Sequence, residues 1–569
     1  MQRLNSQDEY FLDSDTPTAP THIGGLEIYH LPPGAGRDFM QELYTRLKNS
    51  PVRAEPFNYK LVLRQPEQDK AAAKTGLDWL RPAPPRKKKP KPERGWEIVD
   101  NVNVEDHLYL HALPKPGGQR ELGELVSRLH VNRLDRSRPL WEMHLIEGLQ
   151  GGRYAVYNKL HHSQFDGKRG MSLAKHTRSP NAATRNLPPA WSVMVDKAGR
   201  ADKPKSGAAE PASKLKALAS WGKALSSMSD ARKNKAGEGV IAPYSAPQTI
   251  LNGPLTARRR LGTQSLPIER MKALGAAVEG GATVNEILLA VFGGALRRYL
   301  LELKALPEQP LIAACPVAMP RKEDGASGNA VGQILVALGT HVADPKQRLL
   351  AVVASSKTNK GLMKEMEGEA YTHYTALSMM PQVLAAKGGF GHKVLNANLV
   401  ISNVPGPRET QYANGARLES MYAASMLLAG QALNITVSNI GDNLDVGIMA
   451  CPDLCPSPQN IAVYAGEELA ILERAMGLKA PAKKAPSKTA ARKSPAPQKA
   501  APTKAAPKKA APAKAASKKA APKKAAPNKA APKKAAPKRA APNEAATKKA
   551  APNHTAAKQV AAAKRKAGR

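Results

Sequence analysis

The sequence predicts an α/β protein with two layered domains of similar size, followed by a basic tail that cannot fold alone. Helical and strand patterns are mixed along the first 480 residues, which contain almost all the large hydrophobic residues, enough for two ordinary cores. The last 89 residues contain no aromatic residue, Leu, Ile or Met, so they bury too little apolar surface to offset chain entropy. We expect domains over 1–176 and 251–478, a connection over 177–250 and a disordered tail over 479–569.

Net charge divides the chain at the same place. The whole chain carries +39, of which residues 481–569 carry +25 from 26 Lys and Arg and a single acid. This tail repeats KKAAP with a period of five, which does not match the 3.6-residue helical turn, and its prolines remove helix donors. We therefore expect an extended tail. Its charge suits DNA bound without sequence readout or anionic lipid, and a solubilising appendage is the third interpretation.

Cysteine usage and the N-terminus indicate the compartment. Three cysteines in 569 residues exclude a disulfide scaffold and suit a reducing environment. Cys451 and Cys455 have a CxxxC spacing that is unusual for zinc, so no metal site is predicted. The N-terminus lacks the basic start and apolar stretch of a signal peptide, and no run of about 18 apolar residues occurs. We expect a cytoplasmic protein that contacts the inner membrane or lipid inclusions only peripherally.

Three segments of the first domain have a recognisable pattern. Residues 121–134 carry apolar residues at helical spacing, which predicts an amphipathic helix. Residues 153–160, RYAVYNKL, are rich in aromatic and β-branched types between Gly-Gly and His-His, which predicts a strand that ends at a polar cluster. Residues 70–94 contain several prolines and a basic block at 86–91, which predicts an exposed basic loop.

The connection and the second domain also contain helix and strand patterns. The connection is rich in proline and basic residues and has room for a helix, for instance over residues 213–228. The stretch TVNEILLAVFGGALRRYLLEL predicts a helix capped by Thr283. Thr283 and Glu286 have capping-box spacing, in which hydroxyl and carboxylate each accept from the other residue's amide. Residues 396–404 and 432–440 are rich in β-branched residues and predict strands.

The heptad HHSQFDG stands at residues 161–167, directly after the predicted strand. A histidine with an unperturbed pKa near ~6.5 can take a proton from a hydroxyl at cellular pH and pass it on, which suits a general base. Asp166 can orient the turn or the imidazole, and Gly167 removes side-chain bulk where a substrate must pass. Three other interpretations remain: a structural histidine pair, a metal site without an evident closing ligand, and a nucleophile at Ser163 without a GxSxG elbow.

The heptad matches HHxxxDG, and with it the chain resembles the bacterial wax ester synthase/acyl-CoA:diacylglycerol acyltransferase family. Further elements of that family occur before and after the heptad, in the same order as in the family. They are PLW at 139–141, LNGPL at 251–255, TVNEILLA at 283–290 and NVPGP at 403–407. The opening stretch, LNSQDEYFLDSDTPTAPTHIGGLEIY, is also similar to the family, so the resemblance covers roughly residues 4–475.

The resemblance implies the fold of CoA-dependent acyltransferases similar to chloramphenicol acetyltransferase, with two related α/β domains and a channel between them. It implies that His162 deprotonates the hydroxyl of diacylglycerol or a long-chain alcohol, which then attacks acyl-CoA directly to form triacylglycerol or wax ester. His161 is the other catalytic-motif histidine. In this family Asp166 aligns the loop and Gly167 keeps the channel open. Acyl-CoA is a substrate, so no cofactor is expected.

Five further residues are candidates for substrate binding or structural support. The family's usual Asn-Asp pair appears here as Asn285-Glu286, where Glu286 is interpreted mainly as a helix cap. Asn285 serves either local hydrogen bonding or active-site support. Pro139 and Trp141 are expected to pack more than to contact substrate, and Asn403 is expected to shape a tight turn near the channel.

A second function class remains open because of the tail. The tail resembles those of histone H1 and of Lys-Ala-Pro-rich bacterial nucleoid and storage-granule proteins. The competing hypothesis is therefore a protein that tethers lipid granules to the nucleoid through its basic tail, with little or no catalysis. The expected partners are acyl-CoA, diacylglycerol or a long-chain alcohol, a membrane or granule surface, and for the tail DNA or anionic lipid.

Overall fold

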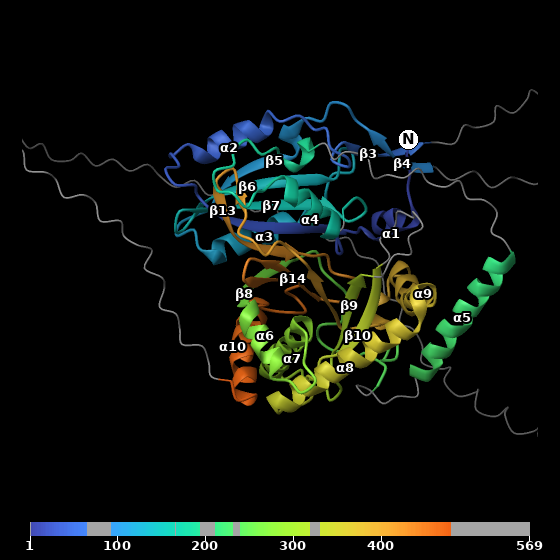
Figure 1. Ribbon diagram of the computed structural model, residues 1–569. Helices are drawn as coiled ribbons and strands as arrows, with labels where there is room; N and C mark the ends of the chain where they lie inside the picture. Colours follow the sequence, from blue (N-terminus) through green and yellow to red (C-terminus); the bar gives the residue numbers. More distant parts are fainter. Residues whose placement is uncertain are drawn as a thin grey trace, which may run out of the picture. The chain divides into compact units, whose positions relative to one another are not determined.

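The computed structural model describes residues 2–64, 93–165, 167–193, 211–231, 239–318 and 331–478 (Figure 1). The predicted basic block at 86–91 and the predicted tail at 479–569 lie outside these residues. Chain contacts group Met1–Ala485 into one compact unit. Helices and strands alternate through this unit, which confirms the predicted α/β class.

The first six-stranded sheet holds the strand that ends at the histidine pair. Its order is β12-β13-β2-β7-β6-β5, and only the β5–β6 pair is parallel. The predicted strand over 153–160 is β7, and the predicted helix over 121–134 is α3, whose His130 Nδ1 lies 2.7 Å from the Tyr157 hydroxyl of β7. The strands are β2 (His22–His30), β5 (Leu108–Ala112), β6 (Trp141–Leu149), β7 (Arg153–His161), β12 (Tyr412–Ala413) and β13 (Ala416–Ala424).

The second six-stranded sheet comes from the C-terminal half. Its order is β10-β9-β11-β14-β15-β8, and β11 runs parallel to both β9 and β14. The predicted strands over 396–404 and 432–440 are β11 and β14. The bounds are β8 (Arg260–Pro267), β9 (Ile312–Ala318), β10 (Val331–Ala337), β11 (Leu399–Val404), β14 (Leu433–Ile440) and β15 (Asn443–Ala450), and a third, small sheet consists of β1 (Gln2–Arg3), β3 (Tyr59–Arg64) and β4 (Glu93–Ile98).

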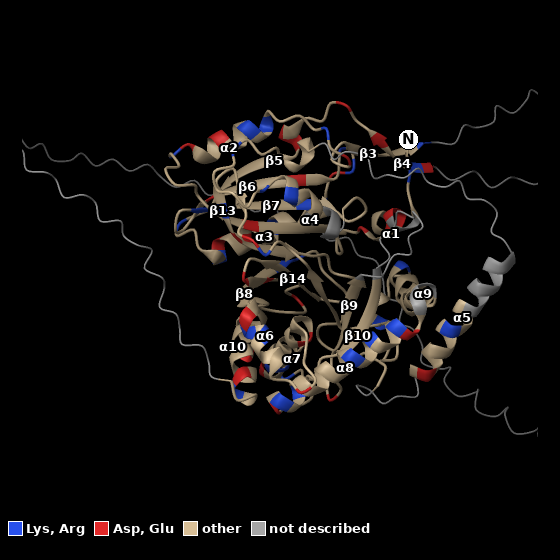
Figure 2. Ribbon diagram, in the orientation of Figure 1, with Lys and Arg blue, Asp and Glu red and all other residues tan. Residues whose placement is uncertain are grey.

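The helices cover the sheets, and α2, α8 and α10 contain both basic and acidic residues (Figure 2). Helices α6, α7, α8 and α10 pack on one another and on the second sheet (Figure 1). The helices are α1 (Ser6–Ser14), α2 (Phe39–Lys48), α3 (Gln119–Val131), α4 (Gly167–His176), α5 (Pro211–Ala231), α6 (Ile268–Ala276), α7 (Val284–Glu302), α8 (Pro345–Glu365), α9 (Glu367–Lys387) and α10 (Gln459–Ala475), with short 3₁₀ turns η2 (Val104–Asp106), η3 (Ala190–Ser192) and η4 (Gly391–Lys393). In the part of the chain that is described, none of them is long and apolar enough to span a bilayer.

The predicted capping box at the start of α7 is confirmed. The Thr283 amide donates to Glu286 Oε2 at 2.8 Å, and the Glu286 amide donates to Thr283 Oγ1 at 3.3 Å. Burial alone would raise the pKa of Glu286, but Lys360 at 2.7 Å and the Thr283 amide outweigh it and lower this pKa. The helix therefore starts where the hydroxyl and the carboxylate satisfy its free amides.

Strand β13 joins the two halves of the chain. It lies in the second half of the sequence, yet it pairs with β2 in the first sheet. Where it passes the second sheet, Gly447 of β15 is so close that an added Cβ would lie 1.9 Å from the Ala423 carbonyl oxygen. Only glycine allows this approach. The domain boundaries predicted from the sequence, 1–176 and 251–478, remain predictions.

Candidate active site

Strand β7 presents alternate residues to a large cavity. Side chains on a strand point alternately to its two faces. Val156, Asn158, Leu160 and His162 line one cavity of about 1280 Å³, whereas His161 does not. The cavity also takes its walls from the second sheet, so both halves of the chain form it. The histidine pair thus divides into one residue on the cavity and one behind it.

His162 is held beside Phe11. Its imidazole stacks on the Phe11 ring with centroids 4.2 Å apart and an angle of 22° between the planes. Its backbone amide donates to the Thr21 carbonyl at 3.0 Å. The predicted general base is therefore in contact with the cavity and fixed by residues from α1 and the segment before β2.

His161 is buried on the other side of the strand. Its Nδ1 lies 2.7 Å from Ser163 Oγ and accepts the Ser163 amide at 3.2 Å. Its Nε2 lies 3.2 Å from Thr21 Oγ1 and 3.9 Å from Asp15 Oδ2. Both ring nitrogens therefore face protein groups. Of the two predicted motif histidines, the structure brings only His162 to the cavity.

Asp15 is a functional candidate that sequence reasoning missed. Its buried carboxylate accepts from Arg133 at 2.7 Å and from Arg136 at 3.0 Å. Burial would raise the pKa of Asp15, but the nearby His161 ring and the hydrogen bonds and charge of Arg133 outweigh it and hold this pKa well below its usual range. The partners lie more than 100 positions away along the chain, so no local spacing could have indicated them.

The remaining predicted residues are distributed between the cavity and the helices. Asp166 lies outside the described residues, and Gly167 is the first residue of α4. Trp141 is buried, lines the cavity and donates from Nε1 to the Phe57 carbonyl at 2.8 Å. Pro139 is buried, and its carbonyl accepts the Trp141 amide at 3.0 Å.

Asn403 and the Asn285-Glu286 pair have different positions. Asn403 is an exposed residue of β11 that lines the cavity. Two hydrogen bonds between Gly406 and Asn439, at 2.7 and 2.8 Å, hold the turn that follows. Asn285 is half-buried at the start of α7 and Glu286 is buried, and neither lines the cavity.

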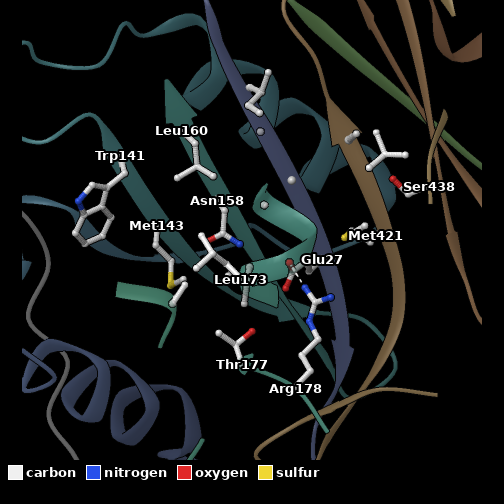
Figure 3. Close-up of a pocket in the computed structure, with 18 of the residues that line it drawn as sticks. Glu27, Trp141, Met143, Asn158, Leu160, Leu173, Thr177, Arg178, Met421 and Ser438 are labelled. Atoms are coloured by element: carbon white, nitrogen blue, oxygen red, sulfur yellow. Dashed lines mark hydrogen bonds and ion pairs between the residues drawn. The ribbon is translucent and has the colours of Figure 1, made fainter. Parts of the chain in front are cut away.

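A buried ion pair in the cavity wall was also missed (Figure 3). Arg178, which follows α4, pairs with Glu27 of β2 and donates from Nε to the Tyr29 hydroxyl at 3.1 Å. The Tyr29 hydroxyl donates to Glu27 at 2.6 Å. Burial raises the pKa of Tyr29 well above its usual value. The pair connects the segment after α4 to β2, one of the two central strands of the first sheet.

The opposite wall of the cavity is polar. Thr436 of β14 lies 2.8 Å from the Ser402 hydroxyl and 2.7 Å from the Ser425 hydroxyl, and its Oγ1 donates to Asn434 at 3.1 Å. All four residues line the cavity. The wall from the first sheet is richer in apolar side chains, among them Trp141. One cavity therefore offers an apolar wall, a hydroxyl-rich wall and one imidazole.

Comparisons with known proteins agree with this arrangement. The family model described as wax ester synthase/diacylglycerol acyltransferase catalytic domain matches residues 62–288, and the model of the WS/DGAT C-terminal domain matches residues 327–473. The chain is 37% identical over 480 residues to a probable diacylglycerol O-acyltransferase, tgs2, of Mycobacterium tuberculosis H37Rv, covering 84% of this chain and all of that one. It is 34% identical over 481 residues to the O-acyltransferase WSD of Acinetobacter baylyi, covering 83% and 97%.

A solved structure supports the fold in the same way. The wax ester synthase/diacylglycerol acyltransferase from Marinobacter aquaeolei VT8 aligns with a TM-score of 0.65 and 32% identity. The alignment covers 84% of this chain and all of that one. The predicted acyltransferase-type α/β fold is thereby confirmed.

Proposed function

The chain belongs to the wax ester synthase/diacylglycerol acyltransferase family, and we propose that it is an O-acyltransferase that moves a fatty acyl group from acyl-CoA to diacylglycerol, a long-chain alcohol or both. The observation that carries this proposal is the imidazole of His162 on the wall of a cavity of about 1280 Å³. This volume exceeds the ~300–1,000 Å³ that is usual for sites of small ligands. It is therefore suited to large lipid substrates.

The proposed reaction needs one base and no covalent intermediate. The His162 imidazole takes the proton from the acceptor hydroxyl, and the oxygen attacks the thioester carbonyl carbon. The new C–O bond forms as the C–S bond breaks, and the imidazolium returns its proton to the CoA thiolate. A positioned base increases the reaction rate about 10²–10⁴-fold, and the alignment of two bound substrates increases it further.

The two walls of the cavity support this assignment of substrates. Alkyl chains are stabilised against apolar side chains, such as those on β6 and β7, because their removal from water is favourable. The hydroxyl and amide groups around Thr436 suit the polar part of a substrate, since buried polar groups need hydrogen-bond partners. A fatty acyl thioester has both parts.

The test is a substitution at His162. Purified His162→Ala should lose ester formation from palmitoyl-CoA by at least ~100-fold, with hexadecanol and with dioleoylglycerol as acceptors. The matched control is His176→Ala, because His176 is an exposed histidine at the end of α4. Full activity of folded His162→Ala would disprove the proposed base.

We further propose that the enzyme works peripherally, at a membrane or lipid-inclusion surface. Helix α9 supports this, because Thr375 and Met379 line the cavity while Met380 and Leu384 are 47% and 62% exposed one turn apart. The double variant Met380→Ser/Leu384→Ser should bind phospholipid vesicles at least ~10-fold more weakly. Leu350→Ser, on α8, is the control and should bind normally, since Leu350 is 40% exposed on a helix from which no residue lines the cavity.

The basic tail gives a separate proposal. Its charge and its resemblance to histone H1 tails support binding to phosphates, of either anionic lipid or DNA, with strong salt dependence. Deleting residues 481–569 should remove the salt-sensitive part of vesicle or DNA binding and leave turnover in detergent intact. The tethering hypothesis instead expects little turnover in the full chain, with binding as the main activity that truncation removes.

A further inference from the structure

We propose that the segment from α1 to the start of β2 is a clamp that positions the His162 imidazole for the reaction. The clamp consists of Phe11, Asp15 and Thr21. It contacts the end of β7 through the side chain of His161. The inference rests on the proposed acyl transfer, because it assigns positioning residues to that reaction. None of the clamp residues belongs to the HHSQFDG heptad.

Phe11 restricts the rotation of the imidazole. The last torsion of a histidine side chain is broad, so the ring can take many orientations unless a neighbour selects one. The stack on Phe11, at 4.2 Å and 22°, covers one face of the ring and leaves the edges with the nitrogens to the side. Phe11 is itself only 8% exposed, so its own ring is held in place. The imidazole therefore keeps one plane within the cavity.

Thr21 ties the segment that carries Phe11 to the end of β7. Its hydroxyl donates to the Phe11 carbonyl at 2.9 Å. Its backbone carbonyl accepts the His162 amide at 3.0 Å. Because one residue bonds to both members of the stack, the distance between the two rings is determined locally.

His161 extends this connection into the protein. Its Nδ1 accepts the Ser163 amide at 3.2 Å, so in the neutral ring the proton is assigned to Nε2. The Thr21 hydroxyl has already donated its proton, and its lone pair can accept from this Nε2 at 3.2 Å. Both ring nitrogens of His161 therefore bond to protein groups. His161 connects Thr21 to the end of β7 and is not a base facing the cavity.

Asp15 anchors the clamp to the segment that follows α3. Its Oδ1 accepts the Thr21 amide at 3.3 Å, and its Oδ2 lies 3.9 Å from His161 Nε2. Arg133 and Arg136 hold the same carboxylate at 2.7 and 3.0 Å. The side chain of Asp15 is only 3% exposed, whereas those of Arg133 and Arg136 are each 35% exposed, so the carboxylate is buried while the guanidinium groups still reach solvent. Three segments far apart in the sequence thus meet behind one imidazole.

Thr21→Val is the central test, because valine keeps the shape and removes the hydroxyl that joins Phe11 to His161. We expect kcat to fall by about 10–100-fold, since a displacement of ~1 Å can cost about 10²-fold, while KM for both substrates stays within about threefold. Thr21→Ser, which restores the hydroxyl, should recover most of kcat. A residue that only supports the fold would lower the melting temperature without this split between kcat and KM.

Two further variants provide a matched pair. Asp15→Asn should lower kcat in the same way, whereas Asp13→Asn should not. Asp13 lies in the last turn of α1, two residues before Asp15, but its carboxylate is 42% exposed and pairs with Arg94. If Thr21→Val does not fold, Phe11→Leu tests the clamp in its place, because it removes the stack and keeps an apolar side chain. Its kcat should fall in the same way.

The outcomes separate the clamp from the proposed function. Wild-type kcat in folded Thr21→Val and Phe11→Leu, with His162→Ala inactive, would overturn the clamp alone. Equal losses in Asp13→Asn and Asp15→Asn would also overturn it. Activity in His162→Ala would overturn the proposed function first, whatever the clamp variants do.

Discussion

Replacing Asp445 by Asn should stabilise the protein above pH 6 and remove one pH dependence of its stability. Asp445 is a buried residue of β15 and is 1% exposed. Burial raises its pKa from 3.8 to about 6, although hydrogen bonds from Ser265 and the Met421 amide act in the opposite direction. Met421 belongs to β13, so this carboxyl lies where the two sheets are joined.

The magnitude follows from the difference in pKa between the folded and unfolded states. Below pH 3.8 the carboxyl is protonated in both states and costs nothing. Between pH 3.8 and 6 the folded state binds the extra proton, so stability falls as pH rises, by about 3 kcal/mol in total at ~1.36 kcal/mol per pKa unit. Above pH 6 the whole cost of the buried charge is present.

Asn suits the hydrogen-bond partners of this site. Its oxygen can accept the Met421 amide, which Asp445 accepts at 2.8 Å. Its NH₂ group can donate to the Ser265 hydroxyl, now 2.5 Å from the carboxyl, because a hydroxyl can accept as well as donate. No buried polar group therefore loses its partner.

Urea unfolding at pH 4.5, 6 and 8 gives the test. The free energy of unfolding of Asp445→Asn minus that of the wild type should rise by about 2 kcal/mol across this range, since part of the total is already lost at pH 4.5. Asp442→Asn, at the exposed turn before β15, is the control and should show no such rise. A difference that stays constant between pH 4.5 and pH 8 would refute the argument from burial.

Three other substitutions test the packing around the site. Thr283→Ala should cost about 1 kcal/mol of unfolding free energy in urea without changing kcat, because the cap of α7 does not line the cavity. Gly447→Ala should lower the melting temperature strongly or prevent soluble expression, whereas Gly361→Ala on α8, which has open space, should keep or raise it. Trp141→Phe should cost about 1–3 kcal/mol in the same urea assay, because it leaves the buried Phe57 carbonyl without its donor; an unchanged midpoint would contradict this.

Local patterns were sufficient for much of the fold. The strand before the histidine pair, the amphipathic helix that became α3 and the capping box of α7 all depend on residues within a few positions of each other. Backbone propensity and hydrogen bonds at this range act within the segment, so its own residues specify them. The same holds for the HHSQFDG heptad, which indicates the family together with the PLW, LNGPL, TVNEILLA and NVPGP elements.

Contacts between residues far apart in the chain could not be predicted from local patterns. Period-two alternation predicts that His161, the last residue of β7, and His162, directly after it, point in opposite directions, but it does not say which of them meets the cavity. Packing of the second sheet against the first decides that, and it also brings in β13 from more than 250 positions away.

Asp15 and Arg178 illustrate the same limit. Neither residue lies in a recognisable sequence motif. Asp15 becomes part of the site through His161 and Arg133, and Arg178 through Glu27, all of which come from other elements. The chain order thus specifies which side chain can take a proton and where the strands and helices lie. The folded packing alone specifies what surrounds that side chain, because charge, burial and stacking act through space between residues that the sequence keeps apart.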